Sequence, residues 1–390
     1  MMQSTQDILE QLIGFDTVSR HSNLALIDYV ADYLDGHGVA VERVFSSDQT
    51  KANLLAVIGP PDQPGIVLSG HTDVVPVDGQ NWSHDPFVLR EADGRLYGRG
   101  TADMKGYIAS VLSRVPEMKQ ARLSKPIILA FSYDEEIGCV GVRDMLKTMA
   151  DWPVKPAGCI VGEPTSMSVV IGHKGKRSLR VTVKGTAAHS SLAPSAVNAV
   201  EYGARLTVYI QDVARKLIVN GQRDSLFDVP HTTAHVGVIN GGTQLNIVPE
   251  QCVLDFEFRS LPEDDVDAMV ESVKQFAALE LEPQMQAVVA ETGISFEAIS
   301  GFPGLSTQPG HGFVGSVRKL ANNAAIGKVA FGTEAGLFTE RVGIPAVVCG
   351  PGSIVQAHRA NEYIDLSQLQ QCDDFISNVV ISCTEGAPAG

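Results

Sequence analysis

Short apolar segments that alternate with amphipathic stretches constrain the fold of this 390-residue chain most strongly. Strand-length runs rich in Val, Ile, Leu and Ala occur at residues 52–59, 65–75, 126–138, 157–164, 328–332 and 345–352. Runs this apolar are typical of strands buried on both faces of a sheet. The amphipathic stretches 4–15 and 23–38 favour helices. Strands that alternate with helices predict an α/β fold, with a sheet flanked by helices.

The pattern changes between residues 176 and 298. Here the sequence predicts, in order, a strand (178–187), a helix (196–219), two strands (233–242 and 250–260), a helix (263–281) and a strand (284–300). That βαββαβ order is typical of a small α+β layer. We therefore expect an inserted α+β domain at 176–298, and a main domain formed by 1–175 and 299–390. Two domains also suit the length, because single cores stop growing at roughly 250–300 residues.

Composition excludes several function classes. The formal net charge of −15 argues against binding to nucleic acid or to an anionic membrane, which needs clustered Lys and Arg. No apolar run approaches the roughly 20 residues of a membrane span, and the N-terminal segment lacks the apolar core of a signal peptide. The six cysteines form no CxxC pair, so we expect buried free thiols. The absence of a span or signal peptide in the sequence predicts a cytoplasmic location.

Side chains that can bind metals follow the apolar runs. His71, Glu136, Glu163 and His358 each come at or after the end of a predicted strand, and Asp103 follows a glycine-rich stretch just before a helix. In open α/β sheets, sites form outside the carboxyl ends of the strands, so these segments can converge. Two imidazoles and three carboxylates suit Zn²⁺, Co²⁺ or Mn²⁺ better than Ca²⁺.

Five such side chains exceed the three that one open catalytic zinc requires. They fit two metals about 3.5–4 Å apart that share a carboxylate and activate a water. A neighbouring carboxylate can accept the proton of that water, and either Glu135 or Glu136 could fill this role. Asp73, two residues after His71, suits an outer position in which it orients the imidazole.

Each residue also has an ordinary alternative. A single histidine after a strand, such as His71, is more often a hydrogen-bonded loop residue. A Glu-Glu pair is usually a solvated turn, Glu163-Pro164 resembles a strand terminator, and the glycines around Asp103 suit a simple connection. The coincidence of five metal-competent residues at strand ends favours the metal site.

Several motifs together identify the chain as similar to the M20-type metallohydrolases. They are SGHTDVVP, GRGTADMKG, YDEEIG, GEPT and the late QAH, in this order, within a resemblance that covers about residues 5–380. The family includes acetylornithine deacetylases, succinyl-diaminopimelate desuccinylases, aminoacylases and carboxypeptidases. The resemblance implies a zinc-peptidase-like mixed sheet that holds two zinc (or cobalt) ions, and a ferredoxin-like lid that forms a homodimer.

The resemblance also distributes the metal ligands. It implies that His71 and Glu163 bind one metal, that Glu136 and His358 bind the other, and that Asp103 bridges both. In such proteins the peptide bond after Asp103 is typically cis.

Further roles follow from the same resemblance. Glu135 becomes the general base and Asp73 the residue that orients the imidazole. His189, in the lid, becomes a donor that stabilises the oxyanion, in its own or in a partner subunit's site. Asn246 and Arg259 become partners of a substrate carboxylate, which the planar fork of an arginine pairs well. Without the resemblance, His189 would read as a loop residue and Arg259 as a surface strand residue.

The C-terminal motifs resemble the acetylornithine deacetylase branch most. They are GPGSI (350–354), QAH (356–358) and NEY (361–363). Gly332 and Glu334 are expected to border the pocket, with Glu334 as a partner for a cationic amine or as a structural loop carboxylate. The expected reaction is removal of the acetyl group from N2-acetyl-L-ornithine, a step of arginine biosynthesis.

Two alternatives stay open. One is another N-acyl amino acid hydrolase with the same machinery, such as a desuccinylase, an aminoacylase or a carboxypeptidase. The other is a catalytically silent binding protein, which we disfavour because every expected ligand position and the base are filled.

Overall fold

A computed structural model describes residues 3–385 of the chain, which divide into two compact units. The first contains residues up to Gly172, Leu305–Lys328 and the segment from Thr333 onward. The second contains His173–Gly304 and Val329–Gly332. The sequence places these divisions at 175/176 and 298/299. The second unit extends further because its strand β12 (Gly293–Phe302) pairs with β9 (Gly175–Lys184) as far as Phe302 opposite Lys176.

The first unit is built around a mixed sheet in the strand order β1-β2-β6-β3-β7-β15-β8-β13, with β14 beside β8. The strands are β1 (Val41–Phe45), β2 (Ala52–Ile58), β3 (Ile66–His71), β6 (Ile127–Ser132), β7 (Gly158–Pro164), β8 (Val169–His173), β13 (Leu305–Ser306), β14 (Ile326–Val329) and β15 (Ala346–Gly350). Four neighbours, β6, β3, β7 and β15, run parallel to one another. They are almost wholly buried, as their apolar sequences predict.

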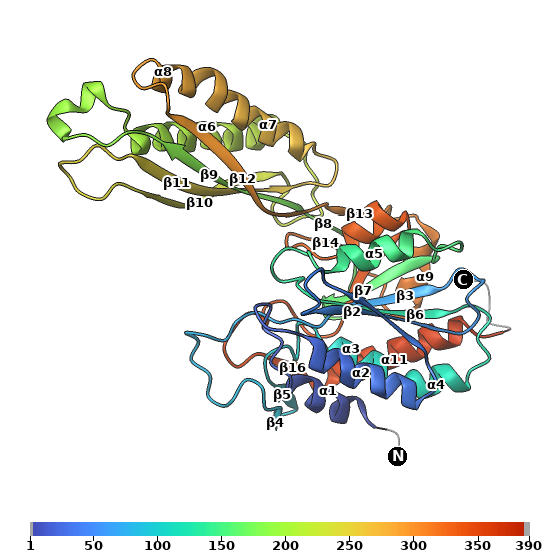
Figure 1. The fold of residues 1–390 in the computed structure, drawn as a ribbon. Coiled ribbons are helices and arrows are strands. Elements are labelled where there is room, and N and C mark those ends of the chain that lie inside the picture. Colours follow the sequence, from blue (N-terminus) through green and yellow to red (C-terminus); the bar gives the residue numbers. More distant parts are fainter. Residues whose placement is uncertain (1–2, 386–390) are drawn as a thin grey trace. The chain divides into compact units, whose positions relative to one another are not determined.

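Helices flank this sheet (Figure 1). They are α1 (Thr5–Ile13), α2 (Leu24–Gly36), α3 (Lys105–Ser113), α4 (Val115–Gln120), α5 (Val142–Ala150), α9 (Gly312–Leu320), α10 (Ala335–Leu337) with a π-helical turn (Phe338–Val342), and α11 (Leu366–Ser382). Helices α1, α2, α3 and α11 cover one face, and α5 lies on the other. The core on the α3 face joins side chains from α1, α2, α3, α11 and the sheet.

A small second sheet of this unit has the strand order β16-β5-β4. Its strands are β4 (Arg90–Ala92), β5 (Arg95–Tyr97) and β16 (Tyr363–Asp365). Tyr363 pairs with Tyr97, so the segment with Asp103, which follows β5, and the segment with His358, which precedes β16, start from paired residues.

The second unit has the predicted βαββαβ order. Its elements are β9, a 3₁₀ turn (Ser190–Ser195), α6 (Ala199–Asn220), β10 (Thr233–Gly241), β11 (Gln251–Ser260), α7 (Val266–Phe276), a π-helical turn (Ala277–Leu281), α8 (Glu282–Gln286) and β12. The strands form an antiparallel sheet in the order β10-β11-β9-β12, and α6 and α7 pack on one face (Figure 1). The α/β fold class with an inserted α+β unit is thus confirmed.

One predicted boundary in this unit is wrong. The last strand was expected to begin at residue 284, but Gln284–Gln286 belong to α8. Pro283 stands in the first turn of that helix, where its missing N–H costs nothing, and the chain stays helical until residue 286. All six cysteines are free and buried, as expected. Within residues 3–385, no helix has both the length and the apolar character needed to cross a membrane.

Candidate active site

The candidate site lies at the carboxyl ends of the four parallel strands. His71 is the last residue of β3, and Glu163 is the penultimate residue of β7. Glu135 and Glu136 follow β6, and His358 lies in the loop after β15. Because these strands are parallel neighbours, their carboxyl ends meet at one edge of the sheet and bring together residues nearly 290 positions apart.

Asp103 occupies the middle of the cluster. Its Oδ1 lies 3.1 Å from Nε2 of His71, and its Oδ2 lies 3.2 Å from Nε2 of His358. Each oxygen therefore faces a different imidazole. The peptide bond between Asp103 and Met104 is cis, as the family resemblance implies.

The two other carboxylates each join one side of this arrangement. Oε1 of Glu163 lies 3.7 Å from Nε2 of His71, and Oε2 of Glu136 lies 3.2 Å from Nε2 of His358. The structure thus groups His71 with Glu163 and His358 with Glu136, with Asp103 between the two pairs. Donor atoms of His71, Asp103 and Glu136 also lie within 4.8 Å of one another, so the two groups are close.

Asp73 connects the first imidazole to the loop after β6. Nδ1 of His71 donates to the backbone carbonyl of Asp73 at 2.9 Å, and Oδ1 of Asp73 lies 3.5 Å from the same nitrogen. The Asp73 carboxylate also accepts the backbone N–H groups of Glu135 and Glu136, at 3.1 and 3.3 Å. It also accepts a hydrogen bond from the hydroxyl of Ser19 at 2.7 Å. This buried carboxylate therefore orients both a candidate ligand and the loop that carries the candidate base.

Glu135 lies beside the cluster. Donor atoms of His71, Glu135 and Glu163 fall within 4.8 Å of one another, and Oε1 of Glu135 accepts the thiol of Cys139 at 3.3 Å. Burial raises the pKa of the Glu135 carboxyl well above its ordinary value, which the nearby His71 opposes and Glu136 reinforces. A carboxyl with a raised pKa is a more effective proton carrier near neutral pH.

The electrostatics of the cluster favour a bound cation. Burial, then the charge of Asp103, raises the pKa of Glu136 to about 7, and burial likewise raises the pKa of Glu163. Oε1 of Glu136 is buried and has no hydrogen-bond partner among residues 3–385. Several buried carboxylates with only two imidazoles form a donor set of oxygen and nitrogen, which divalent transition metals prefer. The residues present therefore fit two divalent metals.

Glu334 is a further buried carboxylate in the same unit. Only 1% of the residue is exposed, and neither carboxylate oxygen makes a hydrogen bond of normal geometry within the described part of the chain. Burial raises its pKa to about 7, although the nearby Ser132 hydroxyl and His71 oppose the shift.

The remaining candidates belong to the second unit. His189 is exposed, and its Nδ1 accepts a hydrogen bond from the hydroxyl of Ser191 at 2.8 Å. Asn246 is close to it in this unit, because the carbonyl of Asn246 accepts the backbone N–H of Ser190 at 2.9 Å. Arg259, on β11, donates to Glu257 at 2.9 Å, and Gly332 also falls in this unit. These residues thus belong to a different compact unit from the carboxylate cluster.

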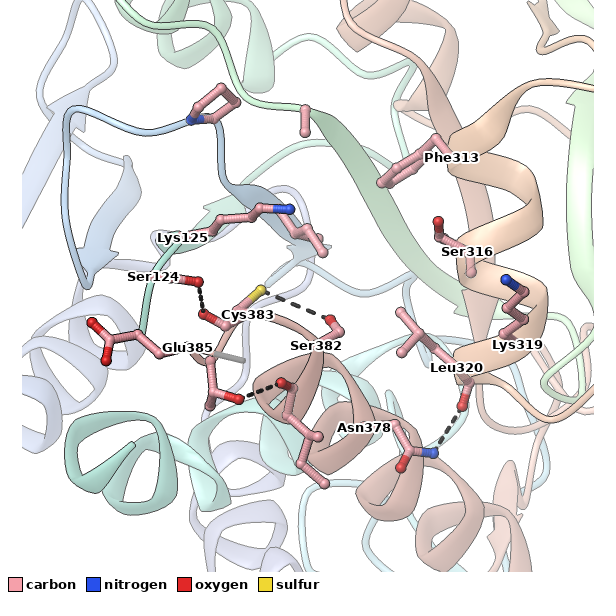
Figure 2. A pocket seen from close by; sticks show the side chains of 16 residues that line it. Ser124, Lys125, Phe313, Ser316, Lys319, Leu320, Asn378, Ser382, Cys383 and Glu385 are labelled. Atoms are coloured by element: carbon pink, nitrogen blue, oxygen red, sulfur yellow. Dashed lines mark hydrogen bonds between the residues drawn. The ribbon is translucent and has the colours of Figure 1, made fainter. Parts of the chain in front are cut away.

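A large cavity occupies the opposite end of the parallel strands. It measures about 810 Å³ and is lined by residues that precede β3, β6 and β7, among them Pro64, Lys125 and Ala157, and by parts of α9 and α11 (Figure 2). The titratable groups that line it include Lys125, Lys319, Cys383 and Glu385 (Figure 2). None of the metal-competent cluster contributes to its wall. The candidate ligands and base therefore lie at the carboxyl ends of the strands and do not line this cavity.

Some residues around the site escaped the sequence-based prediction. Ser19 and Cys139 contact Asp73 and Glu135, but a single Ser or Cys in a loop carries no distinguishing pattern. Arg99 and Glu362 form a buried pair next to Asp103. Both lie inside motifs that the sequence had singled out, GRGTADMKG and NEY, so the signal was present.

Comparison with known families decides what kind of protein this is. The model of peptidase family M20/M25/M40 matches residues 67–382. The chain belongs to this family. M20 enzymes are dinuclear metal-dependent hydrolases, so the protein is a metallo-amidohydrolase, as the motifs predict.

Individual relatives agree with this assignment. The chain is 33% identical over 369 residues to an acetylornithine deacetylase of Pectobacterium carotovorum. This match covers 94% of this chain and 92% of that protein. Among solved structures, an M20 metallo-carboxypeptidase from Sulfolobus solfataricus has a TM-score of 0.75 at 18% identity, over 97% of this chain and 99% of its own. A dinuclear metal-binding M20 peptidase from Bacillus subtilis has a TM-score of 0.66 at 15% identity, over 97% of both chains. The structures share the M20 fold with this chain.

Proposed function

We propose that this M20 enzyme hydrolyses N2-acetyl-L-ornithine to ornithine and acetate, a step of arginine biosynthesis. The observation that carries the reaction type is the position of Asp103, whose two oxygens face the imidazoles of His71 and His358. A carboxylate that faces two separate nitrogen donors is suited to bridge two metals. The substrate assignment is supported by the similarity to acetylornithine deacetylases over nearly the whole chain.

The ligands are divided between two metals in this proposal. His71 and Glu163 would hold one ion, Glu136 and His358 the other, and Asp103 both. Zn²⁺ or Co²⁺ suits this mixture of imidazole and carboxylate donors. When bound, such a pair supplies a Lewis acid for the amide carbonyl and lowers the pKa of a water molecule.

Glu135 would act as the proton carrier. Its carboxylate would accept a proton from the attacking water and deliver that proton to the nitrogen of the departing amine. The hydrogen bonds from the Glu135 and Glu136 backbone to Asp73 hold the loop that positions this carboxylate. Asp73 would thereby orient both the base and the His71 imidazole.

The inserted unit would supply substrate contacts and the dimer interface. His189 would stabilise the oxyanion that develops in the transition state, in its own or in a partner's site. Asn246 and Arg259 would pair with the substrate carboxylate, and Gly332 would border the pocket. The edge strand β10 carries exposed Val238 and Ile239, which supports a homodimer through this unit.

Glu334 supports a substrate that carries a side-chain amine. Its carboxylate is buried and makes no normal hydrogen bond within residues 3–385. A cation that reached it would therefore offset the free-energy cost of burying this carboxylate away from water. N2-acetyl-L-ornithine has such an amine, whereas acetylmethionine does not. We place the enzyme in the cytoplasm, where this substrate would be metabolised.

A substrate panel tests the proposal. Metal-depleted protein is reconstituted with Zn²⁺ or Co²⁺, and turnover is measured on acetylornithine, succinyl-diaminopimelate and acetylmethionine. We expect the highest kcat/KM on acetylornithine. Preference for either other substrate would overturn the substrate assignment but not the assignment as a hydrolase. Failure of the wild-type protein to bind divalent metal would overturn both assignments.

A further inference from the structure

A buried ion pair lies next to the backbone of Asp103. Nη1 of Arg99 donates to Oε2 of Glu362 at 2.6 Å, and each side chain is only 1% exposed. Two charges taken out of water are costly to bury unless geometry and additional hydrogen bonds compensate. The position of the pair therefore calls for a reason beyond fold stability.

The second oxygen of Glu362 holds the backbone around Asp103. Oε1 of Glu362 accepts the backbone N–H of Ala102 at 2.9 Å and that of Asp103 itself at 3.1 Å. Glu362 also follows His358 by four residues, in the same loop. One carboxylate thus fixes the backbone of one candidate ligand from the segment that carries another.

The other terminal nitrogen of Arg99, Nη2, is connected to His358 through the side chain of Gln80. Nη2 of Arg99 donates to Oε1 of Gln80 at 2.6 Å, and Nε2 of Gln80 donates to the backbone carbonyl of His358 at 3.0 Å. Trp82 donates to the same Gln80 oxygen at 3.0 Å, and its ring lies under the Arg99 guanidinium at 5.1 Å. The planar guanidinium of an arginine can donate to Glu362 and to Gln80 at the same time, whereas the single ammonium group of a lysine could not do so in this geometry.

We propose that Arg99, Glu362 and Gln80 are positioning residues that set the spacing between Asp103 and His358. This inference rests on the proposed dinuclear site. His358 is the candidate ligand that most needs such support. Its side chain is about half exposed, and it lies in a loop with a left-handed backbone (φ 62°). Asp103, His71 and Glu163 are instead buried in or beside the core.

The position of the network predicts which metal is affected. His71 is held by Asp73 and by the end of β3, so its metal should keep most of its affinity when the network is broken. The affinity for the metal held by Glu136 and His358 should fall. The reason is that the distance between His358 and the oxygen of Asp103 that faces it would no longer be fixed. Outer residues that orient ligands typically contribute about 10- to 100-fold in metal affinity.

The first test is Glu362→Gln, which leaves an acceptor for the two backbone N–H groups but puts an amide opposite Arg99. Zn²⁺ affinities of the whole protein are measured by competition with a chromophoric chelator, and thermal unfolding is measured on the metal-free protein. We expect one of the two affinities to fall about 10- to 100-fold while the other changes little. The matched control is Asp373→Asn, which breaks the 3.0 Å ion pair with Arg114 at the far end of α3.

Gln80→Ala provides a second test that leaves no buried charge unpaired, so it decides the question if Glu362→Gln does not fold. It should weaken the same metal, whereas Asn378→Ala, which removes a comparable amide-to-carbonyl bond to Leu320, should not. Unchanged affinities for both metals in Gln80→Ala, or a fall in thermal stability alone in Glu362→Gln, would overturn the inference. Absence of two metals in the wild-type protein would instead overturn the proposed function.

Discussion

Oδ1 of Asp73 accepts the backbone N–H of Glu135 at 3.1 Å. The same carboxylate lies 3.5 Å from the ring of His71, so one buried side chain links the candidate base to a candidate ligand. A change at Asp73 should therefore disturb both the alignment of the base and the orientation of the His71 imidazole.

Asp73→Asn is expected to lower kcat about 10- to 100-fold, because an amide nitrogen would face N–H donors that the carboxylate now accepts. Steady-state kinetics with saturating metal measures this effect. Ser19→Ala removes only the hydroxyl that donates to Asp73 at 2.7 Å and should produce a smaller loss. Equal kcat values for Asp73→Asn and the wild-type protein would contradict the orienting role.

Glu135→Gln removes the proton carrier but keeps the shape of the side chain. We expect kcat to fall by roughly 10²–10⁴, the usual contribution of general acid–base catalysis, with both metals retained. Metal content by elemental analysis is measured alongside turnover. Glu136→Gln serves as the contrast, since it should lose metal. Near-normal turnover of a fully metallated Glu135→Gln protein would show that another group carries the proton.

Metal affinity should rise with pH. In the metal-free protein, hydrogen bonds to Asp103 and Glu136 raise the pKa of His358 to about 10. A metal binds the neutral imidazole, so below about pH 10 it must displace this proton. Apparent affinity should increase roughly tenfold per pH unit for each proton displaced. Chelator competition between about pH 6.5 and 8.5 checks the slope, and affinity independent of pH would contradict a protonated His358.

Gly162 next to Glu163 leaves no room for a side chain. A Cβ at this position would lie 2.1 Å from the ring of Tyr107, which is fully buried. Gly162→Ala should therefore lower the free energy of unfolding by roughly 1–3 kcal/mol or more, as measured by denaturant titration. Gly315→Ala in α9, where a Cβ meets nothing within 4 Å, is the control and should be neutral or stabilising. Equal destabilisation by both changes would refute the steric argument.

The most apolar elements, and the functional candidates that lie after them, could be predicted from the sequence. Strands β2, β3, β6, β7 and β15 are mostly apolar, and their burial follows from composition. Strand β1 was not anticipated, because VERVF carries charges at an exposed edge. Strands β4, β5 and β16 are three residues each, too short for a periodic pattern.

The pairing of distant residues could not be read from the chain. Nothing in the pattern specifies that β15 lies between β7 and β8, which determines where His358 is delivered. Likewise, Arg99 and Glu362 are typical of motif residues, but only the paired strands β5 and β16 bring them together. Charged side chains are predicted to be solvated unless a partner is known, and that partner lies more than 260 residues away.

The strand order also has a consequence for synthesis. A ribosome releases His71, Asp103, Glu136 and Glu163 before the inserted unit, but β15 and His358 follow it. Because β15 takes an interior place between β7 and β8, the first unit stays open along its middle until almost the whole polypeptide has been made. A premature stop within the inserted unit would therefore yield a chain that has four of the five metal-competent side chains but lacks the strand between β7 and β8 in its main sheet. Completion of the metal centre is thus tied to completion of the protein.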